Sequence, residues 1–199
     1  MQPLESIYRS NFFARRSSLD WRPALICNGL NHTFKLPQGS TIIDVGCATG
    51  DLVKELNIRG YKADGIEGSK SALPYFQTDS IYTFDLRNKI IDPNFQKAYK
   101  LAISIEVAEH IEEEFSDNFI YNMIFLSDLI MITAALPGAK GHYHVNCQLP
   151  EYWIEKFAKV NYIYEKNLTD KLKLFFEPMQ KKKGISQLFF NTLIFKNKV

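Results

Sequence analysis

The chain has 199 residues, of which 46% are hydrophobic and 23% are charged, and its formal net charge is +2. This length and composition suit one globular domain and exclude disordered, collagen-like and mucin-like chains. The near balance of 24 basic and 22 acidic residues is also unlike a dedicated nucleic-acid-binding protein. We therefore expect a single domain over residues 1–199.

The cysteines and the N-terminal segment indicate the compartment. Cys27, Cys47 and Cys147 show no C-x-x-C spacing, which disfavours a disulfide framework or a zinc site. The N-terminus lacks the apolar core of a signal peptide, and no apolar run is long enough to span a bilayer. We expect a cytoplasmic protein with no membrane contact.

Short apolar segments alternate along the chain with segments of helical periodicity. A helical N-terminal stretch to about Phe34 precedes a strand predicted over residues 40–45. The next segment predicts a helix that buries Leu52, Val53 and Leu56 and stops at Gly60. Further strands are predicted at residues 62–67, 80–86, 100–107 and 128–136, with a short helix near 69–76 and an acid-rich helical segment to about 125.

The C-terminal third predicts one helix and two strands. Residues 151–160 have helical spacing, with Tyr152 or Trp153, Phe157 and Val160 facing the core. Strands are predicted over residues 161–168 and 187–195, joined as an antiparallel hairpin by a turn at residues 181–184.

This alternation predicts the fold class. We expect an α/β, Rossmann-like, doubly wound sheet of seven mostly parallel strands with an antiparallel last strand, in three α/β/α layers. Ligands of such sheets bind at the carboxyl ends of the strands, where the strand order reverses beside the first strand.

The loop after the first predicted strand, "DVGCATGDL" at residues 44–52, indicates the cofactor. It lacks the second glycine of the dinucleotide fingerprint and the Gly-Lys-Ser/Thr of a phosphate-binding loop. Asp44 and Asp51 disfavour a polyphosphate and would suit a cationic ligand.

The loop resembles the first motif of class I S-adenosylmethionine-dependent methyltransferases, and the resemblance extends over residues 40–136. "GIEGS" around Glu67 resembles the segment whose acid binds the ribose hydroxyls, and "TFDL" around Asp85 resembles the segment that contacts adenine. The resemblance implies S-adenosylmethionine as cofactor and these cofactor-binding residues: Asp44, Gly46, Cys47, Ala48, Thr49, Gly50, Glu67, Gly68, Asp85, Leu86 and Glu106. We interpret Cys47 as a small loop residue rather than a reactive thiol.

The fourth predicted strand ends in "EVAEH", and "GHYHVNCQ" follows the fifth. We expect Glu106, Glu109 and His110 to address one pocket, joined by His142 or His144. "EVAEH" resembles the E-x-x-E-H segment of ubiquinone-pathway O-methyltransferases and small-RNA 2′-O-methyltransferases, where acids and histidines hold a divalent ion. The resemblance implies Glu106, Glu109, His110 and His144 as ligands of Mg²⁺ or Mn²⁺. Two alternatives stay open: metal-free catalysis by His110, Glu109 and His144, or structural packing.

"GHYHVNCQLPEYWIEKF" also resembles methyltransferases of glycan gene clusters, which implies that His144, Asn146 and Gln148 face the substrate. Residues 1–36 predict a helical lid or substrate segment. We expect O-methylation of a small-molecule or carbohydrate hydroxyl. RNA 2′-O-methylation is an alternative with RNA as partner, and a catalytically inactive, cofactor-binding partner or sensor subunit is another.

Overall fold

The computed structural model describes residues 2–15, 21–182 and 185–198. They form one sheet in the order β3-β2-β1-β4-β5-β7-β6. The strands are β1 (Thr41–Val45), β2 (Lys62–Glu67), β3 (Ile81–Thr83), β4 (Leu101–Ile105), β5 (Leu129–Thr133), β6 (Tyr162–Tyr164) and β7 (Thr192–Asn197). β1, β2, β3, β4 and β5 pair in parallel, whereas β7 is antiparallel to both β5 and β6. The fold class is therefore as predicted.

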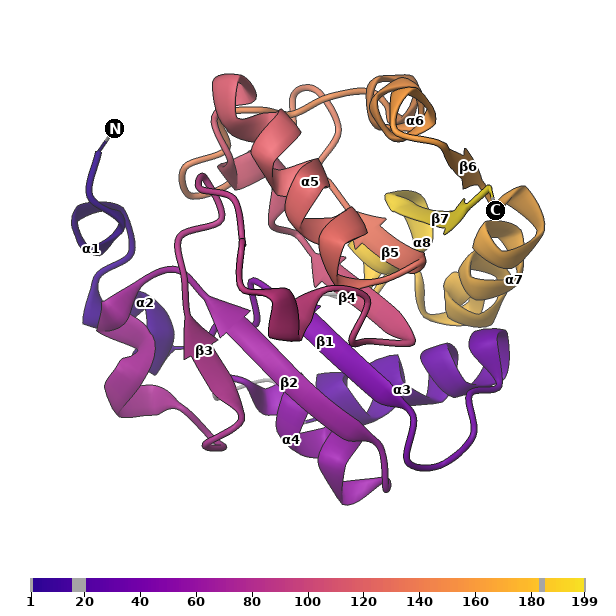
Figure 1. The fold of residues 1–199 in the computed structure, drawn as a ribbon, viewed down its shortest axis with the longest axis horizontal. Helices are drawn as coiled ribbons and strands as arrows, with labels where there is room; N and C mark the ends of the chain where they lie inside the picture. The colour runs from indigo at the N-terminus through magenta and orange to yellow at the C-terminus, as the bar shows by residue number, and fades with distance from the viewer. Residues whose placement is uncertain (1, 16–20, 183–184, 199) are drawn as a thin grey trace.

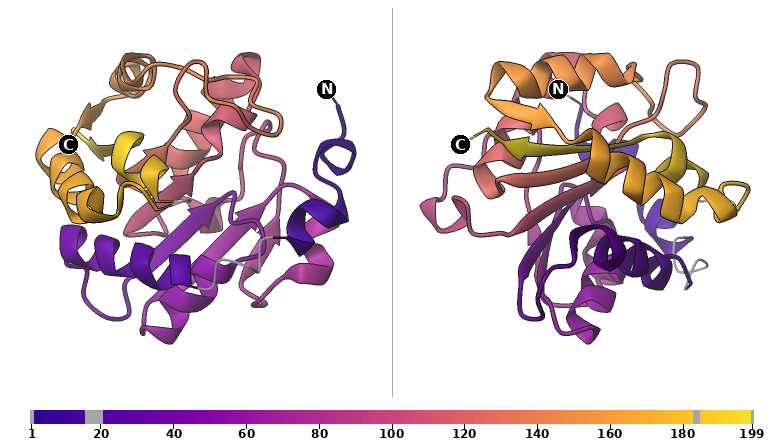
Figure 2. Two further views of the ribbon diagram at one scale, coloured as in Figure 1. Left: turned by 180° about the vertical axis from the view of Figure 1, so that it is seen from behind. Right: turned by 90° about the vertical axis from the view of Figure 1, so that its right-hand side faces the viewer.

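Helices cover both faces of the sheet (Figures 1 and 2). They are α1 (Leu4–Ile7), α2 (Ser10–Ala14), α3 (Trp21–Phe34), α4 (Asp51–Ile58), α5 (Ser116–Leu126), α6 (Pro150–Lys159), α7 (Lys166–Phe176) and α8 (Ser186–Phe190). Short 3-10 helices are η2 (Lys70–Tyr75), η3 (Pro93–Phe95), η4 (Ala108–His110), η5 (Glu113–Phe115) and η6 (Glu177–Met179). One apolar core lies under α5 and α6, and a second lies under α3, α4, α7 and α8.

The four interior parallel strands form where the sequence places short apolar runs. β2 has the predicted bounds, and β1, β4 and β5 lie within theirs. α4 buries Leu52, Val53 and Leu56, and its chain then turns at Gly60, whose φ of +87° lies in the left-handed region. The expected order of strands and helices up to residue 133 is thus confirmed.

The predicted C-terminal hairpin is wrong. β6 and β7 are antiparallel neighbours, but α7, η6 and α8 separate them along the chain. Thr169, Leu172 and Phe176 are buried at helical spacing on α7, which explains the helix. The predicted turn at 181–184 lies partly outside the described residues.

The helix at residues 150–159 packs through two of the predicted aromatic residues. Trp153 and Phe157 are buried, and the Phe157 ring stacks on Phe195 with centroids 4.0 Å apart. Val160, expected in the core, follows the last helical residue and is exposed. The apolar face of α6 therefore ends before Val160.

None of the helices in the described part of the chain has the length and apolar character needed to cross a membrane.

Candidate active site

A cavity lies at the carboxyl ends of the central strands. Strand order reverses there, because β1 has β2 on one side and β4 on the other. The predicted site residues that line it are Gly46, Ala48, Glu67, Gly68, Asp85, Leu86, Glu106 and His110. The loops after β1, β2, β3 and β4 thus converge on one cavity.

The loop after β1 curls toward β2. The N–H groups of Gly46 and Cys47 donate to the carbonyl oxygen of Ile66, at 2.8 and 2.9 Å. Gly46 has a φ of +84°, and a Cβ there would lie 2.4 Å from Val107 Cγ2. Only glycine fits this turn, because the chain after β4 packs directly against it.

The Glu67 carboxylate is held at the end of β2 by two backbone amides. Ala48 N–H donates to Oε2 and Ser69 N–H donates to Oε1, each at 2.9 Å. Ala48 itself adopts a φ of +53°, in the left-handed region. Each carboxylate oxygen has a second lone pair, so Glu67 can also accept from hydroxyl groups in the cavity.

The remaining predicted residues of the first loop lie behind the cavity wall. Asp44 and Cys47 are buried. The Thr49 hydroxyl donates to the carboxylate of Asp51. Gly50 adopts a φ of +77° and precedes α4. These residues shape the turn, while Gly46 and Ala48 form its cavity-facing edge.

The Cys47 side chain packs against Gly65 in β2. A Cβ on Gly65 would lie 2.6 Å from Cys47 Sγ and 3.0 Å from Val53 Cγ2. Burial raises the pKa of the Cys47 thiol well above its ordinary value, so the thiol stays protonated. This contact favours the interpretation of Cys47 as a small packing residue.

Gly65→Ala is expected to lower the free energy of unfolding by about 1–3 kcal/mol, because the new methyl group overpacks this contact. In a Cys47→Ala background the same substitution should cost less, since the sulfur atom is gone. Urea denaturation of the four proteins measures the coupling. An equal loss of unfolding free energy in both backgrounds would show that the Cys47 side chain is not what the new methyl group overpacks.

Asp85 follows β3 and is paired with Arg87, a cavity-lining residue that sequence reasoning missed. Arg87 Nη2 donates to Asp85 Oδ2 at 2.7 Å, and Arg87 Nε donates to both carboxylate oxygens, at 3.0 and 3.1 Å. The Arg87 side chain is 3% exposed and that of Asp85 is 26% exposed. The only sequence signal was an arginine two residues after an expected cofactor acid.

Glu106 directly follows β4 in the left-handed conformation, with a φ of +56°. Its N–H donates to Thr133 Oγ1, and that hydroxyl donates to Glu106 Oε1, both at 2.8 Å. A non-glycine residue in this region carries conformational strain, which is common at functional sites. The strained turn separates Glu106 from η4, which carries Glu109 and His110.

Glu109 is a fully buried carboxyl group beside Glu106. Neither of its carboxylate oxygens accepts a hydrogen bond from a residue within the described ranges. Burial, followed by the charge of Glu106, raises the pKa of Glu109 to about 8, and the nearby amides of Glu109 and Ala135 offset only part of the rise. Glu109 is therefore largely protonated at neutral pH.

His110 lies beside Glu109 and His144. Because a carbonyl oxygen only accepts, His110 Nδ1–H donates to Tyr143 O at 3.1 Å, and the neutral ring carries its lone pair on Nε2. The His110 and His144 ring centroids lie 4.9 Å apart. One ligand atom from each of Glu109, His110 and His144 lies within 4.8 Å of the others. These are three of the four residues predicted to hold a metal.

The structure separates the roles of His142 and His144, which the sequence left open. His142 Nε2 donates to the carbonyl oxygen of Ile7 at 2.7 Å, whereas His144 joins Glu109 and His110. Asn146, which was expected to face the substrate, is buried and is not among the residues that line the cavity. Its Oδ1 accepts from Gln148 Nε2 at 2.9 Å.

Glu109→Gln should change how stability depends on pH. In metal-free protein the folded state holds a proton on Glu109 up to about pH 8, whereas the unfolded chain loses it near pH 4.5. This group therefore stabilises the fold fully below pH 4.5, and the contribution is lost as pH rises toward 8. The free energy of unfolding of the wild type, relative to that of Glu109→Gln, should fall by up to about 1.4 kcal/mol per pH unit between pH 4.5 and about 8. Denaturation curves with a chelator present test this, and a difference independent of pH would contradict it.

The sheet order, the turn after β1, the acid at the end of β2 and the acid after β3 define a class I S-adenosylmethionine-dependent methyltransferase. The family model described as "Methyltransferase domain" matches residues 19–125, and the chain belongs to this family. The cofactor of the class is S-adenosylmethionine.

Among curated proteins, the ubiquinone biosynthesis O-methyltransferase of Rickettsia bellii (strain OSU 85-389) is 29% identical over 140 residues. The match covers 62% of this chain and 58% of that protein, so the chain corresponds to little more than half the length of this relative. The protein of the same description from Rickettsia canadensis is 28% identical over 145 residues, which cover 65% of this chain and 60% of that protein.

Solved structures share the fold at low identity. A phosphoethanolamine N-methyltransferase from Haemonchus contortus superposes with a TM-score of 0.69 at 11% identity, covering 98% of this chain and 59% of that chain. A TehB-like methyltransferase from Corynebacterium glutamicum gives a TM-score of 0.65 at 16% identity, covering 95% and 98%. The small RNA methyltransferase HEN1 gives 0.60 at 15% identity, covering 89% and 25%. At these identities the likeness extends to the fold alone.

Proposed function

We propose that this protein transfers the methyl group of S-adenosylmethionine to a hydroxyl group of a small molecule or carbohydrate. The observation that carries the proposal is the position of His110, which lines the same cavity as Glu67 and Asp85 and is oriented there by the bond between Nδ1 and Tyr143 O. The relatives that are O-methyltransferases by description support the same acceptor type.

The cavity suits the cofactor in the donors and acceptors that it offers. Glu67, fixed by two amides, would accept from the ribose hydroxyls, and Asp85 would accept from the adenine amine. Gly46 and Ala48 bring backbone to the cavity edge, where a larger side chain on Gly46 would strike Val107. When bound, S-adenosylmethionine supplies an electrophilic methyl group for in-line displacement.

His110 would act as the general base. Its Nδ1–H bond to Tyr143 O orients the ring, and Nε2 would take the proton of the acceptor hydroxyl. The neighbouring Glu109 and His144 would hold the acceptor or an ion beside it. Phe12 and Phe13 line the same cavity and would exclude water from the reaction.

A divalent ion fits the acid and imidazole groups, and we include it in the proposal. Glu109 is buried beside a second acid with no hydrogen bond from the described residues, an arrangement that a cation would stabilise. His110 Nδ1 donates to Tyr143 O and His144 Nδ1 to Ala139 O at 3.3 Å, as ring nitrogens commonly do when Nε2 binds metal. In a metal-bound form, Glu109, His110 and His144 would hold Mg²⁺ or Mn²⁺, with Glu106 beside them. His110 Nε2 would then be a ligand, and the ion would activate the hydroxyl in its place by lowering the pKa of the bound group.

Removing divalent ions with a chelator is expected to reduce turnover, and adding back Mg²⁺ or Mn²⁺ should restore it. Cofactor affinity should change little, because the acids that hold the cofactor lie on other strands. Unchanged turnover in a chelated sample that contains no metal by elemental analysis would leave His110 as a metal-free base.

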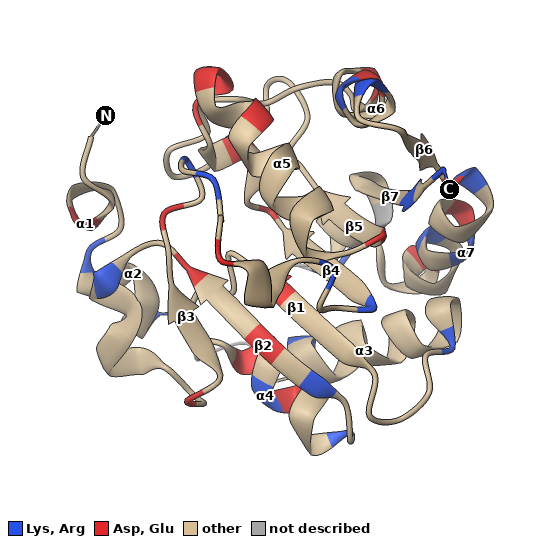
Figure 3. Ribbon diagram, viewed as in Figure 1, with Lys and Arg blue, Asp and Glu red and all other residues tan. Residues whose placement is uncertain are grey.

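We do not extend the proposal to RNA. On α4, α6 and α7 basic and acidic residues occur side by side (Figure 3), which does not favour a polyanion along these helices. The domain in this proposal spans residues 1–199. Its lid is confined to α1 and α2, because α3 buries Ile26, Cys27 and Leu30 against the sheet.

Methyl transfer is tested with labelled S-adenosylmethionine and a panel of phenols, catechols and sugars, followed by mass spectrometry of the products. Label on oxygen of at least one acceptor is the expected result. Saturable cofactor binding together with label only on nitrogen or carbon acceptors would contradict the proposed acceptor type.

A further inference from the structure

The N-terminal segment formed by α1 and α2 closes one side of the cavity. Leu4, Tyr8, Phe12 and Phe13 line it together with the loops after β1, β2, β3 and β4. Leu4 packs so closely on the loop after β2 that a Cβ on Gly68 would lie 2.7 Å from Leu4 Cδ1. A ligand that fills the cavity therefore contacts this segment, which we call the N-terminal lid (residues 2–14).

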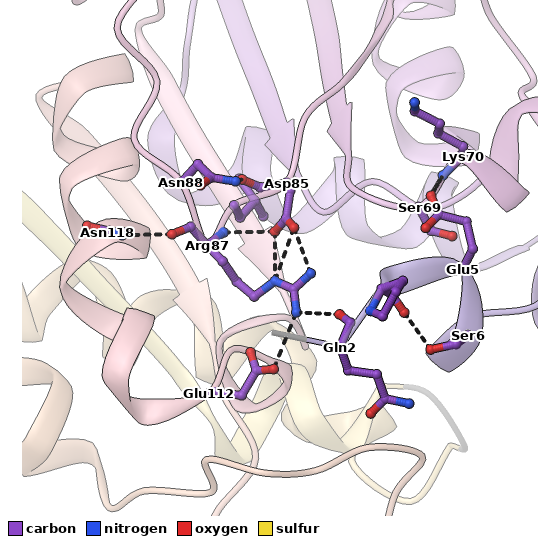
Figure 4. Close-up of polar contacts among 12 residues, drawn as sticks. Gln2, Glu5, Ser6, Ser69, Lys70, Asp85, Arg87, Asn88, Glu112 and Asn118 are labelled. Carbon is purple, nitrogen blue, oxygen red and sulfur yellow. Dashed lines mark hydrogen bonds and ion pairs between the residues drawn. The ribbon is translucent and has the colours of Figure 1, made fainter.

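Three backbone carbonyl groups of the lid accept hydrogen bonds from side chains outside it. Arg87 Nη1 donates to Gln2 O at 2.9 Å, and His142 Nε2 donates to Ile7 O at 2.7 Å. The Ser69 hydroxyl donates to Tyr8 O at 3.2 Å. These donors lie on the loops after β3, β5 and β2, so the lid is bonded to the loops that surround the cavity (Figure 4 shows the Arg87 contact).

Arg87 differs from the other two donors because one charged group, its guanidinium, holds both the lid and a proposed cofactor residue. Ser69 holds Glu67 through its backbone amide and the lid through its hydroxyl. The guanidinium makes a forked contact with Asp85, and its Nη1 lies 3.4 Å from Glu112 Oε1 on the side of η4 (Figure 4). Asn118 Nδ2 donates to the Arg87 carbonyl at 2.7 Å, which fixes the backbone as well. The buried guanidinium of Arg87 thus connects Asp85, Glu112 in the segment between η4 and η5, and the lid.

We propose that Arg87 is a positioning residue that couples closure of the N-terminal lid to occupancy of the cofactor cavity. This inference rests on the proposed function, in which Asp85 contacts the adenine. Opening the lid removes Gln2 O from Arg87 Nη1 and leaves only the longer contact of this nitrogen with Glu112 Oε1. The loss of a charge-assisted hydrogen bond is unfavourable. A cofactor that fixes Asp85 also fixes the guanidinium and so favours the closed lid. The lid in turn delays cofactor release.

Hydrogen exchange of residues 2–14 measures the lid directly. In the wild-type protein, S-adenosylhomocysteine should slow exchange in this segment. In Arg87→Gln, exchange without ligand should be faster, by roughly tenfold or more, the factor expected for one lost charge-assisted hydrogen bond. The added ligand should then restore little protection. The rate at which S-adenosylhomocysteine dissociates from Arg87→Gln should rise by a similar factor.

Arg59→Gln is the matched control. Arg59 also bonds a carboxylate, a side-chain amide and a backbone carbonyl, namely Glu55 at 2.7 Å, Asn28 at 2.5 Å and Ala24 O at 3.1 Å, but it joins α4 to α3. It should leave lid exchange and cofactor release unchanged. Arg87→Lys keeps the charge and loses the fork, so it should give intermediate values, and it decides the question if Arg87→Gln does not fold.

Wild-type protection of the lid in folded Arg87→Gln and Arg87→Lys would overturn the inference. So would faster exchange with an unchanged rate of cofactor release, because the lid would then be fastened without being coupled to the cavity. A wild-type protein that does not bind S-adenosylhomocysteine would instead defeat the proposed function and, with it, the coupling. Exchange in the unliganded variants would still show whether Arg87 holds the lid.

Discussion

Replacing His110 with alanine is expected to lower the rate of methyl transfer by about 10²–10⁴-fold, the usual contribution of a positioned general base. The imidazole lines the cavity and is oriented by the bond between Nδ1 and Tyr143 O, and alanine can neither take the proton of the acceptor nor bind an ion. Affinity for S-adenosylmethionine should stay close to that of the wild type, because Glu67 and Asp85 lie on β2 and after β3.

His32→Ala is the control for this experiment. His32 lies on α3 and packs on Phe175, with ring centroids 5.3 Å apart, away from the cavity. Single-turnover rates with saturating cofactor separate chemistry from binding. A His110→Ala protein that turns over at the wild-type rate would show that another group, or solvent, removes the proton.

Glu67→Ala should weaken binding of S-adenosylmethionine by roughly tenfold to a hundredfold, because charge-assisted hydrogen bonds contribute about 1.5–3 kcal/mol each. The substitution removes the proposed ribose acceptor. It also leaves the Ala48 and Ser69 amides without their carboxylate, so the turn after β1 loses its attachment to β2. Turnover at saturating cofactor should fall less than affinity.

Glu155→Ala, on the exposed side of α6, is the charge-matched control and should bind the cofactor as the wild type does. Calorimetric titrations of the three proteins give the comparison. Equal affinities for Glu67→Ala and wild type would remove this acid from the cofactor site.

Most of the sheet could be predicted because its interior strands are apolar runs bounded by turn residues. β2 was predicted to the residue, and the burial of Leu52, Val53 and Leu56 followed from helical spacing. The connection between the two C-terminal strands was predicted incorrectly. In short apolar segments, β-branched and aromatic residues do not distinguish a strand from a buried helix. β7 pairs with both neighbours and so inserts between β5 and β6 in the sheet.

The site was predictable where motif residues follow parallel strands, since those ends meet at one edge of the sheet. Gly46, Glu67, Asp85 and His110 all line the cavity for this reason. Arg87 escaped prediction because its role depends on Gln2, a residue distant in sequence that only tertiary structure brings near.

The complete burial of Glu109 was also beyond sequence reasoning. It follows from the turn that Glu106 makes in the left-handed conformation and from the segment that covers η4, where Val145 N–H and Asn146 N–H both donate to Glu109 O at 3.0 Å. The spacing in the sequence predicted that Glu106 and Glu109 lie near each other, but it could not predict which of the two carboxyl groups is fully buried.

Direct titration of the purified protein with S-adenosylmethionine, and separately with NAD, tests the central claim. The account predicts saturable binding of the methyl donor at one site per chain and no binding of NAD, because the turn after β1 lacks the glycine that admits a pyrophosphate. Absence of binding by S-adenosylmethionine, or tighter binding of NAD, would contradict it.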